Sequence, residues 1–302
     1  MDVAIDAVDR QEPILLHATI AGTAAGLPIV EYLHASAASW QLAPTVLGFS
    51  GGGMSGAMLA MLAEHLAAQQ IRLVAFDMPG HTPDGLLGSD TPPRSLISRV
   101  TGAVRQAVSQ AVIARWQPHA TRLQVLSHSA GIVDVARLIG EHGGGIERFV
   151  ITGAGIPGVG AMAQAAKASA AAGSLGGIRV SSLIRTRCLP AGNANLMYGP
   201  PAGRVISDCA LARYECPEHV GVPLTLLRAR PVLHQDWRGR RVLLIGSAGD
   251  AIAPPRRIKH AYWRLRARGA VVRSNTLHMD LPHAFLSFQA GAARVAEFIA
   301  AG

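Results

Sequence analysis

A serine, an aspartate and a histidine, far apart in the sequence, have the side chains needed for nucleophilic catalysis. Ser129 is the central residue of Ser-His-Ser-Ala-Gly, between the apolar run 122–126 and a segment with helical periodicity. At a tight turn from strand to helix, flanked by small residues two positions away, a serine can expose its hydroxyl as a nucleophile. A Ser/Gly turn that merely caps a helix is the alternative interpretation of this pentapeptide.

The sequence beyond Ser129 supplies a candidate acid and a candidate base, in that order. Asp250 follows a strongly apolar run and lies in the Gly- and Pro-rich stretch GSAGDAIAPP, and His283 lies in LPHAF before the last expected helix. A serine nucleophile needs a base to remove its proton and an acid to orient that base. Asp280 is a rival acid, disfavoured because it follows the last expected strand. We predict a triad of Ser129, Asp250 and His283.

The elements that must position these residues follow from the periodicity of the chain. Short apolar runs alternate with helical patterns, which predicts a mostly parallel sheet covered by helices on both faces, an α/β fold. Strands are expected at 45–49, 71–77, 122–127, 146–155, 240–250 and 270–277, and helices near 54–69, 94–116, 131–142, 256–268 and 284–300.

Residues 157–239 interrupt this alternation. The segment contains the Ala/Gly-rich stretch AMAQAAKASAAAGSLGG and no clear strand pattern. We interpret it as a lid or cap inserted over the carboxyl edge of the sheet, between a first part of the core at 1–156 and a last part at 240–302.

A glycine pattern in the first part of the chain supports a competing function. Gly51, Gly53 and Gly56 satisfy G-x-G-x-x-G between an expected strand and an expected helix, and Asp77 follows about 20 residues later. In dinucleotide-binding folds such glycines let the backbone approach a pyrophosphate, and the acid holds the ribose hydroxyls. An NAD(P)-dependent oxidoreductase is therefore an alternative.

Together these pieces resemble the α/β-hydrolase superfamily, from about residue 45 to the end of the chain. The motifs that carry the resemblance are LGFSGG at 47–52, AFDMPGH at 75–81, SHSAG at 127–131, GSAGDAIAP at 246–254 and PHAF at 282–285. The chain departs from the family pattern at Leu47-Gly48, where His-Gly is usual, and at Thr82, where a glycine is usual. The resemblance also accounts for the glycine pattern, because the oxyanion loop, the next helix and the next strand form the same βαβ unit.

The resemblance implies an acyl-enzyme mechanism on an ester or thioester. Ser129 would attack a carbonyl, His283 would remove its proton, and Asp250 would hold the imidazole in place. The N–H of Ala130 is implied as one oxyanion donor, and the second is expected from Phe49, or from Ser50 if the register shifts by one. No metal or organic cofactor is expected.

Two further functions stay open on the same scaffold. The triad could pass the acyl group to an alcohol or amine, as in an acyltransferase or cyclase. The fold could also serve as a non-catalytic small-molecule receptor, because a fold does not fix a function.

Composition limits the other classes of protein. The chain has 302 residues, 49% of them hydrophobic, but no apolar run near the roughly 18 residues that cross a bilayer. Its first residues include acids where a signal peptide carries bases, so a cytoplasmic location is expected. The three cysteines, Cys188, Cys209 and Cys216, have no C-x-x-C spacing, which argues against a disulfide framework and a zinc site. The sequence predicts no oligomeric state.

The net charge of +9 raises the question of an anionic partner. With 5% aromatic residues the chain has few side chains for base stacking, so nucleic acid is not expected. The segment 157–238 carries Lys167 and eight arginines against four acids, and RRIKHAYWRLRAR at 256–268 carries no acid. Either the surface is simply basic, or the substrate is anionic, such as a coenzyme A or carrier-protein thioester.

Overall fold

The described strands form a single sheet. The structure is a computed structural model that describes residues 2–5, 14–24, 27–38, 40–51, 54–77, 102–156, 232 and 234–302. The strands are β1 (Asp2–Ile5), β2 (Ile14–Ala24), β3 (Leu27–His34), β4 (Ala43–Phe49), β5 (Arg72–Phe76), β6 (Ala120–His128), β7 (Arg148–Thr152), β8 (Arg241–Ser247) and β9 (Val271–Leu277). They make a nine-stranded sheet in the order β1-β2-β3-β5-β4-β6-β7-β8-β9.

The sheet is antiparallel at one side and parallel over the rest. The pairs β1–β2, β2–β3 and β3–β5 are antiparallel. Strands β5, β4, β6, β7, β8 and β9 run parallel to one another. The parallel part confirms the predicted fold class. The sequence analysis assigned no element before residue 45, so the three N-terminal strands are an addition by the structure.

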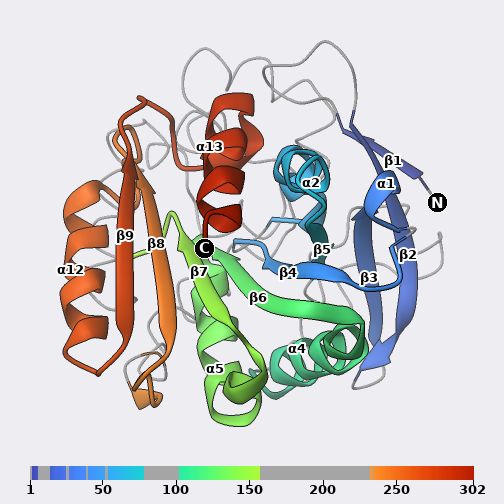
Figure 1. Cartoon of the computed structure of the whole chain (residues 1–302), viewed down its shortest axis with the longest axis horizontal. Helices are drawn as coiled ribbons and strands as arrows, with labels where there is room; N and C mark the ends of the chain where they lie inside the picture. The colour runs from blue at the N-terminus through green and yellow to red at the C-terminus, as the bar shows by residue number, and fades with distance from the viewer. Residues whose placement is uncertain are drawn as a thin grey trace, which may run out of the picture.

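Helices cover both faces of the sheet (Figure 1). They are α1 (Ala35–Ala38), α2 (Ala60–Ala67), α4 (Gly102–Trp116), α5 (Ile132–His142), α12 (Pro255–Arg266) and α13 (Gln289–Ala300). Among the described residues no helix is long and apolar enough to cross a bilayer.

Consecutive strand residues face different hydrophobic cores, because side chains alternate along a strand. Val46 and Leu126 pack in one core with α2 and α13. Their neighbours Leu47 and Val125 pack in the other core with α4, α5 and α12. Burial on both faces explains why consecutive residues of these strands, such as Val46 and Leu47 in β4 and Val125 and Leu126 in β6, are both apolar.

The lid expected at 157–239 lies mostly outside the described residues, as do all three cysteines. Its last residues are described: Val232 and Trp237 are buried in the core that contains α5, and the Trp237 ring lies 5.7 Å from that of Phe149. The packed core therefore resumes before Arg240.

The strand order fixes where a site can form. The chain passes from β4 to β5 on one side and then returns to β6 on the other side of β4. The loops after β4 and β6 thus leave the same edge in opposite directions, and ligands of open α/β sheets bind at such a switch point.

Candidate active site

Ser129 occupies a strained turn directly after β6. Its φ of 52° lies in the left-handed region, which is unfavourable for a residue with a side chain and costs on the order of 1–3 kcal/mol. The 3-10 turn Ser129–Gly131 then leads into α5. A Cβ placed on Gly131 would lie 2.7 Å from the Phe49 carbonyl oxygen, so this position has no room for a larger side chain. These are the features of a nucleophile elbow.

His283 connects Ser129 with Asp250. Its Nε2 lies 2.8 Å from the Ser129 Oγ, and its Nδ1 lies 2.8 Å from the Asp250 Oδ2. The imidazole is buried, and its loop lies between β9 and the 3-10 turn Phe285–Ser287. Ser129 itself is partly exposed, so the hydrogen-bonded chain begins at a reachable hydroxyl.

The other carboxylate oxygen of Asp250 is held by backbone. Oδ1 accepts hydrogen bonds from the N–H groups of Ile252 and Ala253, at 2.9 and 2.8 Å. Burial alone raises the pKa of Asp250, but the charge and hydrogen bond of His283 and the Ala253 N–H outweigh it, so the pKa lies below its ordinary value. The group is therefore a carboxylate at neutral pH, fixed to face the imidazole.

The structure thus brings together the three residues of the predicted triad. The rival acid Asp280 is exposed, and the acid at His283 Nδ1 is Asp250. Among the described residues no group of His, Cys, Asp and Glu side chains is arranged to hold a metal ion.

Among the described residues of the loop after β4, Gly51 adjoins Ser129. A Cβ placed there would lie 3.1 Å from the Ser129 Cβ. Phe49, expected as an oxyanion donor, is the last residue of β4 and pairs with Phe76 and Ser127. A strand residue directs its N–H towards a neighbouring strand. Gly51 was expected as part of the glycine pattern and not as an oxyanion donor, although a run of three glycines signals a close backbone approach.

His128 lies behind the triad as a neutral imidazole. Burial, with a smaller contribution from His283, lowers its pKa to about 3. The Thr152 hydroxyl donates to the Ser127 carbonyl at 3.1 Å, so His128 Nδ1–H donates to the Thr152 Oγ1, also at 3.1 Å. The two imidazole rings lie 5.1 Å apart. His128 therefore supports the turn and places no second positive charge beside His283.

Asp77 and Gly56, two residues of the glycine and aspartate pattern, serve packing against the sheet. The Asp77 carboxylate is buried and accepts hydrogen bonds from the Tyr32 hydroxyl at 2.6 Å, the Ser55 hydroxyl at 2.8 Å and the Gly56 N–H at 2.7 Å. A Cβ on Gly56 would lie 2.7 Å from the Phe76 backbone nitrogen. Asp77, which follows β5, thus holds Gly56 at the start of the 3-10 turn Gly56–Leu59. These bonds account for Asp77 and Gly56 without a dinucleotide.

Comparison with known proteins gives matches in structure only. No protein-family model and no curated protein sequence matches the chain. The esterase RhEst1 from Rhodococcus sp. ECU1013 is 19% identical with a TM-score of 0.62, over 94% of this chain and 98% of that one. The thioesterase domain from the curacin biosynthetic pathway is 13% identical with a TM-score of 0.57, over 95% and 99%.

A third solved structure is an alpha/beta hydrolase fold protein from Chitinophaga pinensis, 14% identical with a TM-score of 0.54, over 94% of this chain and 96% of that one. At such identities the likeness concerns the fold. The parallel sheet, the turn at Ser129 and these three matches agree, and the chain has the α/β-hydrolase fold.

Proposed function

We propose that the protein is a serine hydrolase that cleaves an ester or thioester through an acyl-enzyme. The observation that carries this proposal is the continuous hydrogen-bonded chain from Ser129 through His283 to Asp250, with 2.8 Å at each junction. A nucleophile bonded to a base, and the base bonded to an orienting acid, is the arrangement that activates a serine.

The reaction proceeds in two halves. Ser129 Oγ attacks the acyl carbon while its proton moves to His283 Nε2, and the imidazolium then protonates the departing alkoxide or thiolate. Water attacks the acyl-enzyme and gives a proton to the same nitrogen. The imidazolium then returns that proton to Ser129 Oγ as its bond to the acyl carbon breaks, which releases the acid and free Ser129. Asp250 holds Nδ1–H and stabilises the imidazolium in both halves.

The oxyanion donors are the backbone N–H groups of Ala130 and Gly51 in this proposal. Ala130 follows the nucleophile in the turn that begins α5, where N–H groups point outward at the positive end of the helix dipole. We propose Gly51 beside the expected candidates Phe49 and Ser50, because a Cβ on Gly51 would lie 3.1 Å from the Ser129 Cβ. Such a donor is worth about 3 kcal/mol of transition-state stabilisation.

The triad supports catalysis over a purely binding role. A receptor needs neither the strained φ at Ser129 nor a carboxylate kept charged behind His283, and strain of this kind collects at functional sites. Transfer of the acyl group to an alcohol or amine uses the same residues and differs only in the acceptor. An oxidoreductase finds less support, because the carboxylate of Asp77 is bound within the protein.

An anionic substrate fits the charges beside the site. Gly153 and Gly155 follow β7, and a Cβ on Gly153 would lie 2.8 Å from the His128 imidazole and 3.4 Å from that of His283. A Cβ on Gly155 would lie 3.2 Å from the Cβ of Arg257 in α12. The cationic start of α12 is therefore next to the loop that lines the triad. This favours a coenzyme A or carrier-protein thioester, with the acyl group selected by the segment expected as a lid.

Intact-protein mass spectrometry tests the proposal directly. We expect a covalent adduct with a fluorophosphonate, and, with a panel of acyl esters and acyl-coenzyme A thioesters, a transient adduct whose mass identifies the preferred acyl group. Acid production without added acceptor indicates a hydrolase, whereas product that requires an alcohol or amine indicates a transferase. A chain that forms no adduct with any of these reagents would contradict the proposed function.

A further inference from the structure

Helix α12 presents a row of exposed side chains on the side that faces away from the sheet. Figure 1 shows this helix beside β9, the last strand of the sheet. One face of α12 is buried through Ile258, Ala261 and Leu265, at the spacing of a helical stripe. The residues on the opposite face are all exposed, and we call them the outer face of α12. They are Arg256, Lys259, His260, Trp263 and Arg266.

The outer face is cationic, and the surrounding sequence contains no acid. Residues 251–279 include six arginines and one lysine but no aspartate or glutamate. Lys259, Arg264 and Arg266 form no ion pair with any carboxylate of the part of the chain that the structure describes. Their positive charge is therefore not balanced within this part of the protein.

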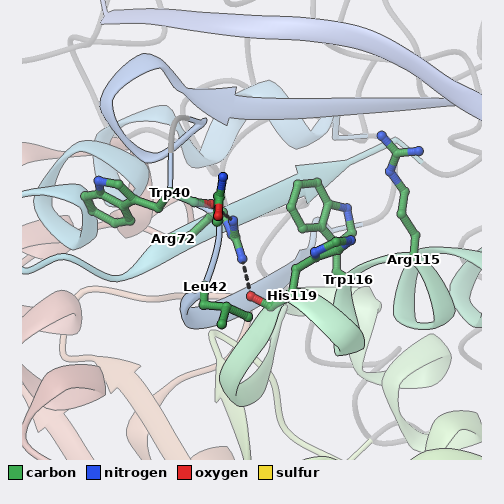
Figure 2. A pocket seen from close by; sticks show the side chains of 7 residues that line it. Trp40, Leu42, Arg72, Arg115, Trp116 and His119 are labelled. Carbon is green, nitrogen blue, oxygen red and sulfur yellow. Dashed lines mark hydrogen bonds between the residues drawn. The ribbon is translucent and has the colours of Figure 1, made fainter.

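The arginines of the other described helices are paired with carboxylates. Arg115, one of the residues around the pocket in Figure 2, lies 3.3 Å from the Glu31 carboxylate although its side chain is half exposed. The full set of pairs is Arg105–Asp134, Arg115–Glu31, Arg137–Asp134 and Arg294–Glu297. The unbalanced charge on α12 is thus a local feature of this helix and not only a consequence of the net charge.

An exposed aromatic side chain lies at the centre of this charge. Trp263 is 56% exposed, and Lys259 and Arg266 lie one helical turn before and after it. The Tyr262 ring lies 5.1 Å from the indole, and Arg266 donates to the Tyr262 hydroxyl at 2.8 Å, which keeps its charge near Trp263. Tryptophan and arginine are enriched among the residues that dominate the energy of protein interfaces. The composition therefore favours a protein partner, and the charge favours an acidic one.

The start of α12 is close to the triad, and its other end is not. A Cβ on Gly155, in the loop that lines the triad, would lie 3.2 Å from the Cβ of Arg257. The helix then continues to the start of β9, which is at the opposite edge of the sheet from Ser129. Its 12 residues extend about 18 Å at roughly 1.5 Å per residue. A partner bound along α12 reaches Ser129 only with an acyl group carried on an extended arm.

We propose that the outer face of α12 binds an acidic acyl carrier protein, whose thioester-bearing arm passes the start of the helix to reach Ser129. This choice of partner rests on the proposed hydrolysis of a thioester. A membrane fits less well, because the apolar residues that would insert are buried in the core. Free coenzyme A also fits the outer face less well, because small molecules bind in concave sites and the outside of a helix is convex.

Calorimetry on the Ser129→Ala variant measures this binding without turnover. The probes are an acyl carrier protein with its pantetheine arm and the same protein without the arm. We expect a Kd of about 100 μM or tighter for both at roughly 20 mM salt, and at least about tenfold weaker binding at roughly 300 mM, because exposed charges are screened. No binding at low salt with about 1 mM carrier protein, or binding only of the form with the arm, would overturn the proposal.

Substitutions on α12 locate the binding surface. In the Ser129→Ala background, Lys259→Glu should weaken binding at least about tenfold and Trp263→Ala at least about fivefold. Both side chains are exposed, so neither change should disturb folding. Arg294→Glu, on the exposed side of α13, makes the same change of net charge and should weaken binding less than about twofold. Equal effects of Lys259→Glu and Arg294→Glu would show that net charge alone drives binding, and the proposal would fail.

Two further measurements separate this binding surface from the proposed function and from a membrane site. Hydrolysis of an acyl-pantetheine thioester by the wild type, with the arm but no carrier protein, reports the proposed function alone. Hydrolysis without carrier binding would overturn the binding surface and leave the proposed function, whereas carrier binding without hydrolysis would do the reverse. Vesicles of phosphatidylcholine and phosphatidylserine, at about 7:3, should not bind. Vesicle binding that both Lys259→Glu and Trp263→Ala abolish would assign the outer face to a membrane and overturn the proposal.

Discussion

The Ser129 Oγ and the His283 Nε2 lie 2.8 Å apart although 154 positions separate the two residues in the sequence. The contact exists because β6 and β9 end at the same edge of one parallel sheet. Two intervening strands, β7 and β8, separate them, so the loop after β9 must extend back across the edge to reach the serine. The predictions below test what this contact does.

The first prediction concerns the nucleophile. Ser129→Ala should abolish labelling by a fluorophosphonate, whereas Ser127→Ala should retain most of it. Ser127 is buried and its hydroxyl has no hydrogen-bond partner among the described residues, so its removal leaves no described group unpaired. Mass mapping of the adduct is the measurement. An adduct that persists in Ser129→Ala would show that the serine is misassigned.

The second prediction separates the two acids. Asp250→Asn should lower turnover by a factor on the order of ten thousand, because an amide no longer fixes the imidazole tautomer. Asp280→Asn should leave turnover within about twofold, because Asp280 is exposed and makes no described contact with His283. Steady-state kinetics at equal folded fraction measure both variants. The reverse ranking would mean that the acid is Asp280.

The third prediction concerns the loop after β4. Gly51→Ala should lower kcat by roughly a hundredfold with a smaller effect on KM, because the new Cβ would displace the loop or Ser129 by a fraction of an ångström. Gly144→Ala is the matched control, since a Cβ at Gly144 meets no atom within 4 Å. Equal kinetics for the two variants would remove Gly51 from the oxyanion site.

The fourth prediction uses the titration of His128. Its folded pKa of about 3 lies below that of an unfolded histidine, so the unfolded chain binds the extra proton and stability is lost as the pH falls below about 6.5. From pH 6.5 to 5 this residue should cost roughly 2 kcal/mol of unfolding free energy. Urea unfolding at both pH values measures how far the unfolding free energy falls from pH 6.5 to pH 5. We expect this fall to be about 2 kcal/mol smaller in His128→Gln than in wild type. Equal losses in the two proteins would place the acid sensitivity at other groups.

The fifth prediction concerns substrate charge. For an acyl-coenzyme A thioester, kcat/KM should fall several-fold between roughly 20 and 300 mM salt, and for a neutral ester it should barely change, because only the charged encounter is screened. Arg257→Gln should reduce the salt effect, because Arg257 adjoins the loop after β7. Arg264→Gln, further along α12, removes the same charge away from that loop. Parallel salt profiles for both substrates would favour a neutral ester.

The parallel core and the triad could be predicted from the sequence because their signals are local. The apolar runs that form β6 and β8 predict buried strands, and Ser129 and Asp250 follow them directly. The N-terminal strands gave weaker evidence in the sequence. Only two residues separate β2 from β3, and the pairing of the two strands shifts register between Ile20 and Gly22, so no regular alternation marks them.

The second oxyanion donor stays a prediction, with Phe49 and Ser50 expected from the sequence and Gly51 added because of its place beside Ser129. The motif LGFSGG does not indicate at which residue β4 ends. The chain also has Leu47 where the family usually has the histidine that precedes the oxyanion loop. Pairing of Phe49 with both Phe76 and Ser127 sets the end of the strand, and this depends on two neighbours distant in sequence.

The alternation of strand residues between two cores restricts how the chain length can evolve. One residue inserted within β6 would exchange the faces of all later strand residues and turn the Ser129 elbow towards the opposite layer of helices. No neighbouring strand could compensate, because β4 and β7 are themselves packed on both faces. Insertions and deletions among relatives should therefore collect between the elements, and the longest stretch between two described strands is 153–240, between β7 and β8.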